Sequence, residues 1–221
     1  MYKILDIVHD FAQRNRRWLL AISFIGVAMS ISGCGSIASD ASTVLTVISL
    51  GLATISTALV FIPGGQAFAG LVAEAAGVVS NLQAEFKSWQ ANPNATTFQN
   101  LMNLANDLDS KLQSILQGSG LPAAAITKIQ AIVQACLTQL QNWINLVKNL
   151  MAKSGTASTN APTAAHAAMV VMSDAELHTQ LKEAQAQAHG FHDQLKQIVD
   201  TPTGDTEVDD AFAKAASYTQ G

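Results

Sequence analysis

The chain has 221 residues, which is enough for one domain with appended segments. Hydrophobic residues make up 49% of the chain and charged residues 13%. This is about half the charged share of an ordinary soluble domain, so we expect part of the chain to contact lipid. No arginine follows Arg17 and the later lysines are scattered singly. Nucleic-acid binding needs clustered cations, so we expect no nucleic-acid partner.

A basic end is followed by an uncharged stretch near the beginning of the chain. Arg14, Arg16 and Arg17 come directly before Trp18–Ser39, which contains no charged residue. Basic residues, an apolar run and small residues before a cysteine form the layout of an export signal. The segment predicts either a cleaved signal or an uncleaved membrane helix over Trp18–Ala38. The cations place the N-terminus in the cytoplasm.

Small residues immediately precede Cys34 in the tetrapeptide Ile31-Ser32-Gly33-Cys34. This tetrapeptide resembles the lipobox of bacterial lipoprotein precursors, and the resemblance covers residues 14–35 only. It implies that residues 1–33 are removed and that Cys34 is lipidated. The protein would then be anchored in the bacterial cell envelope, on its periplasmic or extracellular face. Residues 1–13 form a longer lead than such signals usually have, so an uncleaved anchor with an incidental Cys34 stays open.

Five stripes of apolar residues follow, and their members recur at alternating steps of three and four. This period is typical of helices that pack at shallow angles. Short connections between the first four stripes predict antiparallel neighbours. The expected fold is therefore all-α, an antiparallel helical bundle of about five helices behind an N-terminal hydrophobic membrane-anchor or signal helix. The stripes run over Leu45–Ile62, Phe68–Trp89, Phe98–Ile115, Ile126–Leu150 and Leu177–Ile198.

Helix-breaking residues stand where the stripes stop. Pro63-Gly64-Gly65 ends the first stripe, and Asn92-Pro93-Asn94 separates the second from the third. Thr96 or Thr97 is the expected N-cap of the third helix. Gly118-Ser119-Gly120-Leu121-Pro122 separates the third stripe from the fourth and places its proline near a first helical position.

The C-terminal third divides into three parts. Residues 154–172 are rich in Ala, Thr, Ser and Asn, which predicts a flexible linker after a bundle of residues 34–153. Ser173-Asp174-Ala175-Glu176 is a capping box, so residues 173–200 should form a C-terminal helix that packs on the bundle. Residues 201–221 read as an acidic tail with a short helix around Asp210–Ser217.

An uncharged stretch covers Ala41–Ala73. Within it, Thr43–Ile62 matches the roughly 20 residues that a membrane span needs. This helix could lie at the centre of the bundle, or it could form a membrane hairpin with residues 18–38. The first cation after the stretch is Lys87, too far away to orient a returning hairpin, so the central helix is favoured. A stripe of hydroxyl and small side chains suits close helix packing in either setting; it comprises Ser42, Thr46, Ser49, Ala53 and Thr57.

Residues capable of catalysis or metal binding are sparse. Cys136 falls on a core stripe, where a free cysteine acts as a small hydrophobe. His189 and His192 lie three apart and share a helix face, so they are weak candidates for a metal site. No third ligand accompanies them, and a solvated helix flank is the favoured interpretation. The sequence shows no Glu-x-x-His spacing, nucleophile elbow or phosphate loop, so we expect no enzyme and no cofactor.

The sequence as a whole predicts a membrane-tethered bundle with a structural or protein-interaction role. Its partners would be membrane lipid and either a second copy or another envelope protein. The alternative is an integral membrane protein, of a pore-forming, holin-like or virion/envelope structural kind, which inserts residues 18–38 and 43–62. Polar but nearly uncharged helix faces favour self-association; they carry Gln83, Gln99, Asn100, Asn103, Gln139, Gln141, Asn142 and Asn145.

Overall fold

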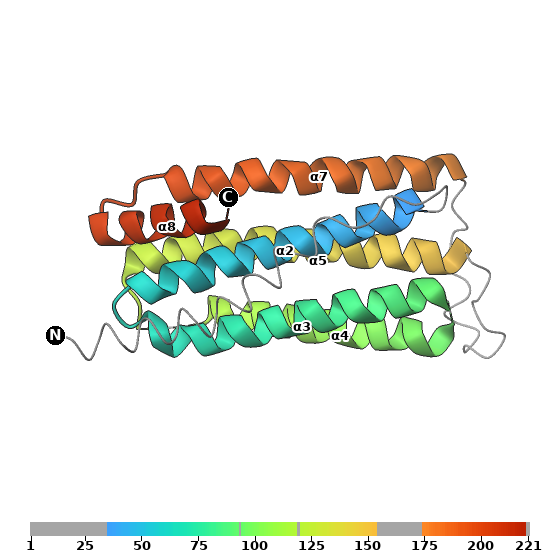
Figure 1. Cartoon of the computed structure of the whole chain (residues 1–221), viewed down its shortest axis with the longest axis horizontal. Coiled ribbons are helices and arrows are strands. Elements are labelled where there is room, and N and C mark those ends of the chain that lie inside the picture. Colours follow the sequence, from blue (N-terminus) through green and yellow to red (C-terminus); the bar gives the residue numbers. More distant parts are fainter. Residues whose placement is uncertain (1–34, 93, 119, 154–173, 220–221) are drawn as a thin grey trace. The chain divides into compact units, whose positions relative to one another are not determined.

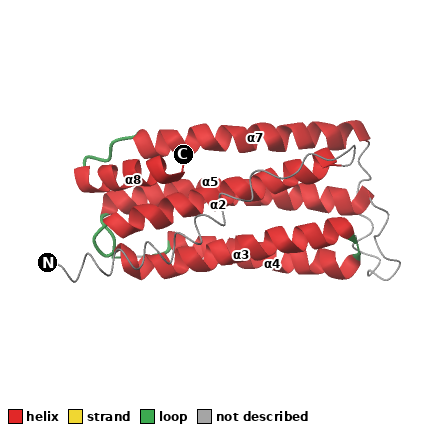
Figure 2. Ribbon diagram, in the orientation of Figure 1, coloured by secondary structure: helices red, strands yellow, loops and turns green. Residues whose placement is uncertain are grey.

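A computed structural model of the chain describes residues 35–92, 94–118, 120–153 and 174–219. The chain divides into two compact units, Met1–Ser36 and Ile37–Gly221, and nearly all of the described residues belong to the second. These residues form helices and connecting turns, without a strand, which confirms the predicted all-α class (Figures 1 and 2). The expected signal with Cys34, the linker over 154–172 and the Ser173 end of the capping box lie outside the described residues.

Each apolar stripe corresponds to one helix, and a sixth helix follows near the C-terminus. Regular burial at helical spacing stabilises these segments beyond their intrinsic helix propensity. The helices are α2 Gly35–Phe61, α3 Gly65–Ala91, α4 Ala95–Leu116, α5 Ala123–Lys153, α7 Asp174–Asp200 and α8 Thr206–Thr219.

Helix α8 is longer than the short helix expected around Asp210–Ser217. Asp205 caps its first turn, since the Val208 amide donates to the Asp205 carboxylate at 3.2 Å. The apolar residues Val208 and Phe212 are buried in the core. The C-terminal segment is therefore acidic on its outer side and apolar on the side that packs.

Consecutive helices pack against each other within the second unit. Helices α3 and α4, α4 and α5, and α7 and α8 are neighbours joined by short turns, and α5 also lies against α7 (Figure 1). Helix α2 packs against both α5 and α7, because the space beside Gly51 is occupied by Ile132 and Cys136 of α5 and by Phe191 of α7. One continuous core includes side chains from all six helices of the described residues.

Burial extends around much of the circumference of α2. Adjacent residues are buried in pairs, which are Val44 with Leu45, Gly51 with Leu52, Thr54 with Ile55, and Ala58 with Leu59. Adjacent helical residues point about 100° apart, so a helix with one packed face would not bury both members of each pair. Helix α2 is an interior helix of the bundle, in agreement with the favoured interpretation of Thr43–Ile62.

The turn between α2 and α3 depends on two glycines. Gly64 has a φ of +78°, in the left-handed region that residues with a Cβ rarely adopt. A Cβ on Gly65 would lie 2.1 Å from the Leu59 carbonyl oxygen, which no side chain could accommodate. The Pro63-Gly64-Gly65 break therefore allows α3 to begin almost directly after α2 ends.

The expected N-cap of α4 was wrong. Asn94 is the cap, because its side-chain oxygen accepts from the backbone amides of Thr96 and Thr97, both at 3.0 Å. Its backbone is extended, with a φ of −150°, as an N-cap requires. Thr97 instead lies inside the first turn, where its hydroxyl donates to the Asn94 carbonyl at 3.1 Å.

Candidate functional site: the apolar α2–α3 hairpin and its surroundings

Helices α2 and α3 form an apolar hairpin. Ser42–Phe61 and Gly65–Ala91 are both long and apolar enough to cross a bilayer, although length and composition alone support such an assignment only weakly. Half of the Ser42–Phe61 stretch is buried inside the protein, against one third of Gly65–Ala91. The more apolar helix is therefore also the better covered one, as expected for a helix at the centre of a bundle.

The hydroxyl groups of α2 bond to the helix itself. Thr46 donates to the Ser42 carbonyl at 3.0 Å and Ser49 donates to the Leu45 carbonyl at 3.1 Å. Thr54, which is fully buried, donates to the Leu50 carbonyl at 3.0 Å. Such bonds back to the preceding turn satisfy a hydroxyl in an apolar environment, so these residues are compatible with a buried helix.

Helix α2 approaches α5 closely at Gly51. A Cβ at this position would lie 2.7 Å from the Cys136 sulfur, and the Cys136 thiol lies 3.9 Å from the Ile48 carbonyl oxygen. Burial raises the pKa of Cys136 to about 12, so the thiol stays protonated near neutral pH and is a poor nucleophile. The expectation that Cys136 is a core residue is confirmed.

The most elaborate polar contact surrounds Lys128 of α5, which is only 3% exposed. Its ammonium donates to the carbonyl oxygens of Val199 at 2.6 Å, Thr201 at 2.8 Å and Ile198 at 3.3 Å. It also lies 3.2 Å from the Asp209 carboxylate of α8. A cation at the end of a helix satisfies carbonyl groups that have no partner within the helix. Lys128 thus ties α5 to the end of α7 and to α8.

Asp209 is held by several donors besides Lys128. Burial by itself raises the pKa of this carboxyl group, but hydrogen bonds from the Thr203 amide and hydroxyl and from Lys128 outweigh it and leave the pKa below its ordinary value. The Thr203 amide lies 3.0 Å from one carboxylate oxygen and its hydroxyl lies 2.9 Å from the other. The carboxylate therefore also fixes the turn between α7 and α8.

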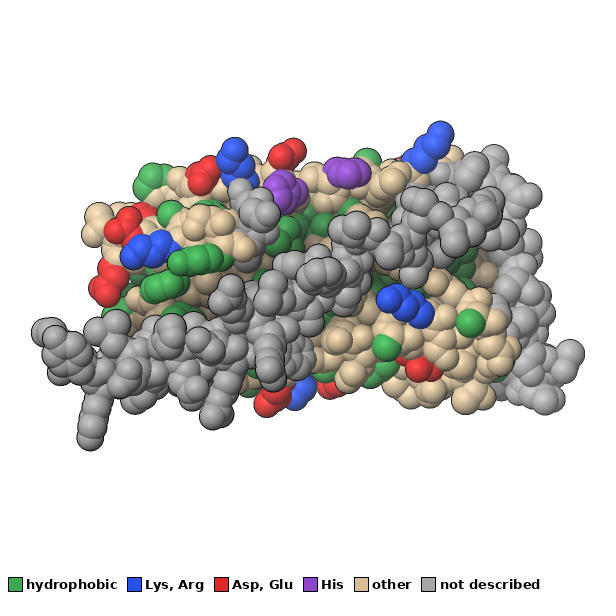
Figure 3. Space-filling model, viewed as in Figure 1, with side chains coloured by type: hydrophobic (Ala, Val, Ile, Leu, Met, Phe, Trp, Pro, Cys, Tyr) green, Lys and Arg blue, Asp and Glu red, His purple; other side chains and the backbone are tan. Residues whose placement is uncertain are grey.

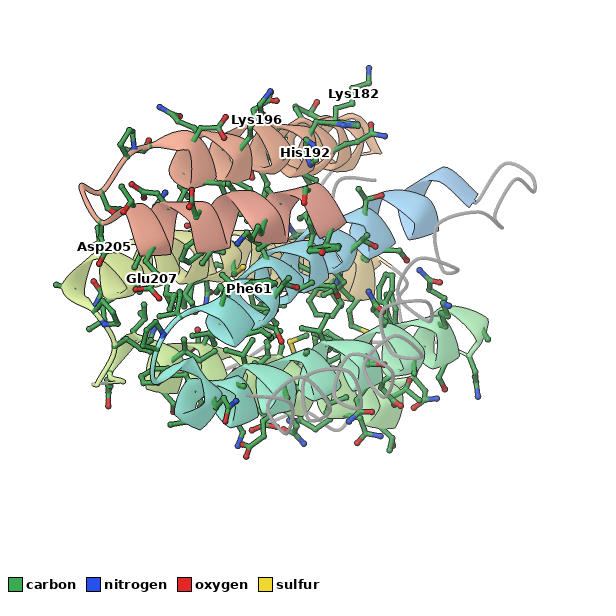
Figure 4. The ribbon with its side chains drawn as sticks, turned by 60° about the vertical axis from the view of Figure 1, so that its left-hand side comes forward. Phe61, Lys182, His192, Lys196, Asp205 and Glu207 are labelled. Atoms are coloured by element: carbon green, nitrogen blue, oxygen red, sulfur yellow. The ribbon has the colours of Figure 1, made fainter. Side chains whose placement is uncertain are left out.

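The histidine pair lies on the outer side of α7. His189 and His192 are both exposed (Figure 3), and Figure 4 shows His192 on α7 near Lys196. Across the described ranges, no three His, Cys, Asp or Glu side chains gather as metal ligands would. The structure brings together only the two histidines, which are too few for a typical zinc site.

An aromatic cluster fills the core between α3 and α5. The Phe86 ring lies 5.9 Å from Trp89 and 5.5 Å from Trp143, measured between ring centroids. The indole N–H groups of both tryptophans are buried without a hydrogen-bond partner among the described residues. Unpaired buried donors lower stability, so this cluster is held by ring packing rather than by polar contacts.

One residue of the expected polar face is not on the surface. Gln139 is 5% exposed, and its side-chain amide donates to the Gln187 carbonyl of α7 at 3.3 Å. Its neighbour Asn142 donates to the Gln187 side chain. These amides join α5 to α7 within the chain, so Gln139 is not available for self-association. Its place among other Gln and Asn residues gave no sign of this burial.

The hairpin turn exposes large apolar side chains. Val60 is 41% exposed and Phe61 is 39% exposed, and Pro63 and Gly64 beside them are exposed as well. The Lys214 ammonium of α8 lies 5.4 Å from the centroid of the Phe61 ring, a typical cation–π distance. Figure 4 shows Phe61 on the side of α2 that faces α8.

Comparison with protein-family models, with curated proteins and with solved structures gives no match to this chain. The function is therefore argued from the geometry of the chain itself.

The sequence missed two polar sites and the exposed turn. In the sequence, Lys128 is a single lysine within an otherwise ordinary helix pattern. In the structure it occupies a position that an apolar residue would usually fill, on a helix that is buried on several sides. Asp209 belongs to an acidic run in which Glu207 and Asp210 are exposed, whereas Asp209 is half-buried. Val60 and Phe61 stand beside the breaker Pro63-Gly64, and large apolar residues next to a tight turn were the one available signal.

Proposed function

We propose that this protein is a membrane-anchored helical bundle with a structural or protein-interaction role and no catalytic activity. The anchor is lipid attached to Cys34 after residues 1–33 are removed, and the location is the bacterial cell envelope. The proposal uses the export-signal layout of the sequence for the anchor and the described helices for the body of the protein.

The position of α2 is the observation that carries this proposal. Helix α2 begins at Gly35, directly after Cys34, and passes through the interior of the bundle. An anchor at Cys34 would therefore be joined to the most buried helix rather than to a peripheral one. A force on the anchored end of α2 would be transmitted into the core of the bundle, which suits a protein with a structural role.

The second candidate is an integral membrane protein, of a pore-forming, holin-like or virion/envelope structural kind, that inserts residues 18–38 and 43–62. It has the support that Ser42–Phe61 is long and apolar enough to span a bilayer. Insertion of α2 would separate it from Cys136 and Phe191, which lie against Gly51, and would expose their apolar surfaces to water. Lipid tails are no more apolar than the core that α2 would leave, so the buried position is favoured.

Metabolic labelling with an alkyne palmitate tests the anchor. Wild-type protein should incorporate the label, and Cys34→Ser should lose it. Cys136→Ser is the matched control: this cysteine is fully buried, so its replacement should leave the label unchanged. Absence of label from the wild type would contradict lipidation. If the unlabelled protein also resists extraction by alkaline carbonate, an uncleaved anchor over residues 18–38, alone or inserted together with residues 43–62, is supported instead.

A further inference from the structure

Helix α8 and the adjoining end of α2 expose apolar and charged side chains together. The structure describes three exposed large hydrophobic residues, Val60, Phe61 and Tyr218. Val60 and Phe61 end α2, and the Lys214 ammonium of α8 lies over the Phe61 ring. Tyr218 follows Lys214 by one helical turn and shares its side of α8. Isolated apolar residues on a surface are ordinary, but a group of them around one cation marks an interaction site.

Three charged residues follow this side of α8 in a fixed order. Glu207, Asp210 and Lys214 are exposed, and their spacing of three and four residues places them on one helix face. Figure 4 shows Glu207 along the same side of α8 as Phe61, and Figure 3 shows hydrophobic, basic and acidic side chains together in this part of the molecule. Helix α2 and its turn add no charge here, because Ala41–Ala73 is uncharged. The face is acidic toward the start of α8 and basic toward its end.

The charges of this face have no ionic partner within the described part of the chain. The ion pairs between described side chains join other residues of the protein. Lys214 follows Asp210 by one turn, but its ammonium lies 5.4 Å from the centroid of the Phe61 ring instead. Both signs of charge are therefore available to a partner molecule.

The order of the charges selects a second copy of the chain as that partner. When two α8 helices lie side by side and antiparallel, the basic end of each meets the acidic end of the other. Lys214 then reaches Glu207 and Asp210 of the second copy, which are about one turn apart. Two-fold symmetry forms this contact twice. Parallel helices would instead place like charges together, so the charges also fix the orientation.

A lipid bilayer fits the same charges less well. Anionic headgroups would repel the exposed carboxylates of Glu207 and Asp210, and zwitterionic headgroups would offer no ordered anions to Lys214. The α8 helix of a second copy would instead neutralise both signs and cover the Phe61 ring. An apolar contact with a charged margin is also the usual composition of a protein interface.

We propose that α8 and the adjoining end of α2 form a two-fold contact with a second copy of this chain, in which the two α8 helices run antiparallel. Lys214 of each copy pairs with the carboxylates of Glu207 and Asp210 of the other, and the contact covers Phe61. The inference rests on the proposed interaction role, whose partner it names, and not on lipid attachment at Cys34.

Recovery of one tagged copy by another tests the contact. Full-length chains with two different tags are co-expressed, solubilised in mild detergent and captured through one tag, and the other tag is quantified by immunoblotting. Lys214→Glu in both copies should reduce recovery at least tenfold, because acidic side chains then face each other. Lys182→Glu is the matched control, since this exposed lysine of α7 lies far from Glu207 (Figure 4). It should change recovery less than twofold.

An exchange of charges between the copies separates a contact from a structural role. A copy with Lys214→Glu, and a copy with both Glu207→Lys and Asp210→Lys, should each fail to recover its own kind. Expressed together, these two copies should recover each other to at least half of the wild-type level, because one face is then wholly acidic and the other wholly basic. Changes in another copy would not restore a role of Lys214 within its own chain.

Each outcome has a definite meaning. Wild-type copies that do not recover each other would overturn the contact and leave the face to lipid or to a different protein. Full recovery of a folded Lys214→Glu protein would overturn it too, as would exchanged copies that are folded by circular dichroism but fail to recover each other. If Lys214→Glu loses its helical signal, Lys214→Gln replaces it and should reduce recovery at least threefold. Intact recovery of a wild-type chain that takes up no palmitate label would contradict the anchor at Cys34 alone.

Discussion

Lys128 shows how a single charged residue is accommodated in an apolar bundle. An ammonium group that is removed from water needs several partners to offset its lost hydration. Here three carbonyl oxygens at the end of α7 and the Asp209 carboxylate provide them. The Phe212 ring, with its centroid 5.6 Å from the ammonium, covers another side. The same contacts stabilise the C-terminal end of α7 and attach α8.

Lys128→Met should lower the free energy of unfolding by about 2–4 kcal/mol, because it leaves buried carbonyl groups and a carboxylate without their donor. Urea denaturation measures this change. Lys196→Met on the exposed side of α7 is the control and should stay within about 0.5 kcal/mol of the wild type. Equal effects of the two substitutions would show that Lys128 has no special role.

Asp209 should make the fold sensitive to acid. Its pKa in the folded protein is lowered, because the bonds from Thr203 and Lys128 outweigh the effect of burial. The stabilisation is complete above the unfolded value near pH 4 and is lost as the pH falls through the folded value. Unfolding measured from about pH 6 to about pH 2.5 should therefore show a steeper loss of stability in the wild type than in Asp209→Asn. Parallel curves would contradict this role.

At the scale of single elements, the α2–α3 turn is held by a close backbone approach. Gly65→Ala should destabilise the protein by about 3 kcal/mol, because its Cβ would collide with the Leu59 carbonyl oxygen. Gly70→Ala is the matched control on the same helix, where a Cβ meets nothing within 4 Å. It should stabilise α3 by about 0.5–1 kcal/mol. Thermal unfolding of both variants measures the contrast, and a tolerated Gly65→Ala would show that the turn relaxes easily.

The interior position of α2 can be tested by a cross-link to α5. Gly51→Cys places a new thiol beside the buried Cys136, since the distance from the Cβ to the Cys136 sulfur is 2.7 Å. In a Cys34→Ser background, oxidation should join the two residues and remove two hydrogens from the intact mass. Gly77→Cys, where a Cβ meets nothing within 4 Å, should keep free thiols. Failure of Gly51→Cys to cross-link would place α2 elsewhere.

The helices could be predicted from the sequence because burial imposes a period that is visible without coordinates. Leu45, Phe86 and Phe191 all stand on stripes that are buried as expected. Helix ends were less predictable, since Asn94 and Thr97 both have capping side chains and only the backbone conformation decides between them. Lys128 and Gln139 could not be placed, because a polar residue is buried only when partners from distant parts of the chain reach it.

The candidate site was predictable only in part. The uncharged stretch over Ala41–Ala73 marked α2 as unusual. Its central position in the bundle was favoured because no cation lies near enough to orient a membrane hairpin. Phe61 is exposed where α8 leaves it uncovered. No local sequence pattern predicts this, because α8 is far from Phe61 in the chain. The histidine pair at His189 and His192 was correctly placed on one face, and the structure adds no further ligand from the described residues.

For the molecule as a whole, α8 is an integral part of the bundle. Its residues Val208, Ala211, Phe212 and Ala215 belong to the common core. A chain that ends at Asp200 should lose several kcal/mol of stability and bind a dye for exposed apolar surface. A chain that ends at Ser217 keeps these contacts and should behave as the full chain. Equal dye binding by the two truncated chains would show that α8 is dispensable.

The Lys128 contact also orders the events of folding. Its carboxylate partner, Asp209, is on the last helix. The charge of the Lys128 ammonium is therefore neutralised only after most of the chain has been synthesised. Until then the ammonium stays hydrated, and burying this end of α5 would cost the free energy of that hydration without the carboxylate to offset it. A polypeptide that crosses a membrane before folding would benefit from such a delay, because translocation requires a chain that has not yet become compact.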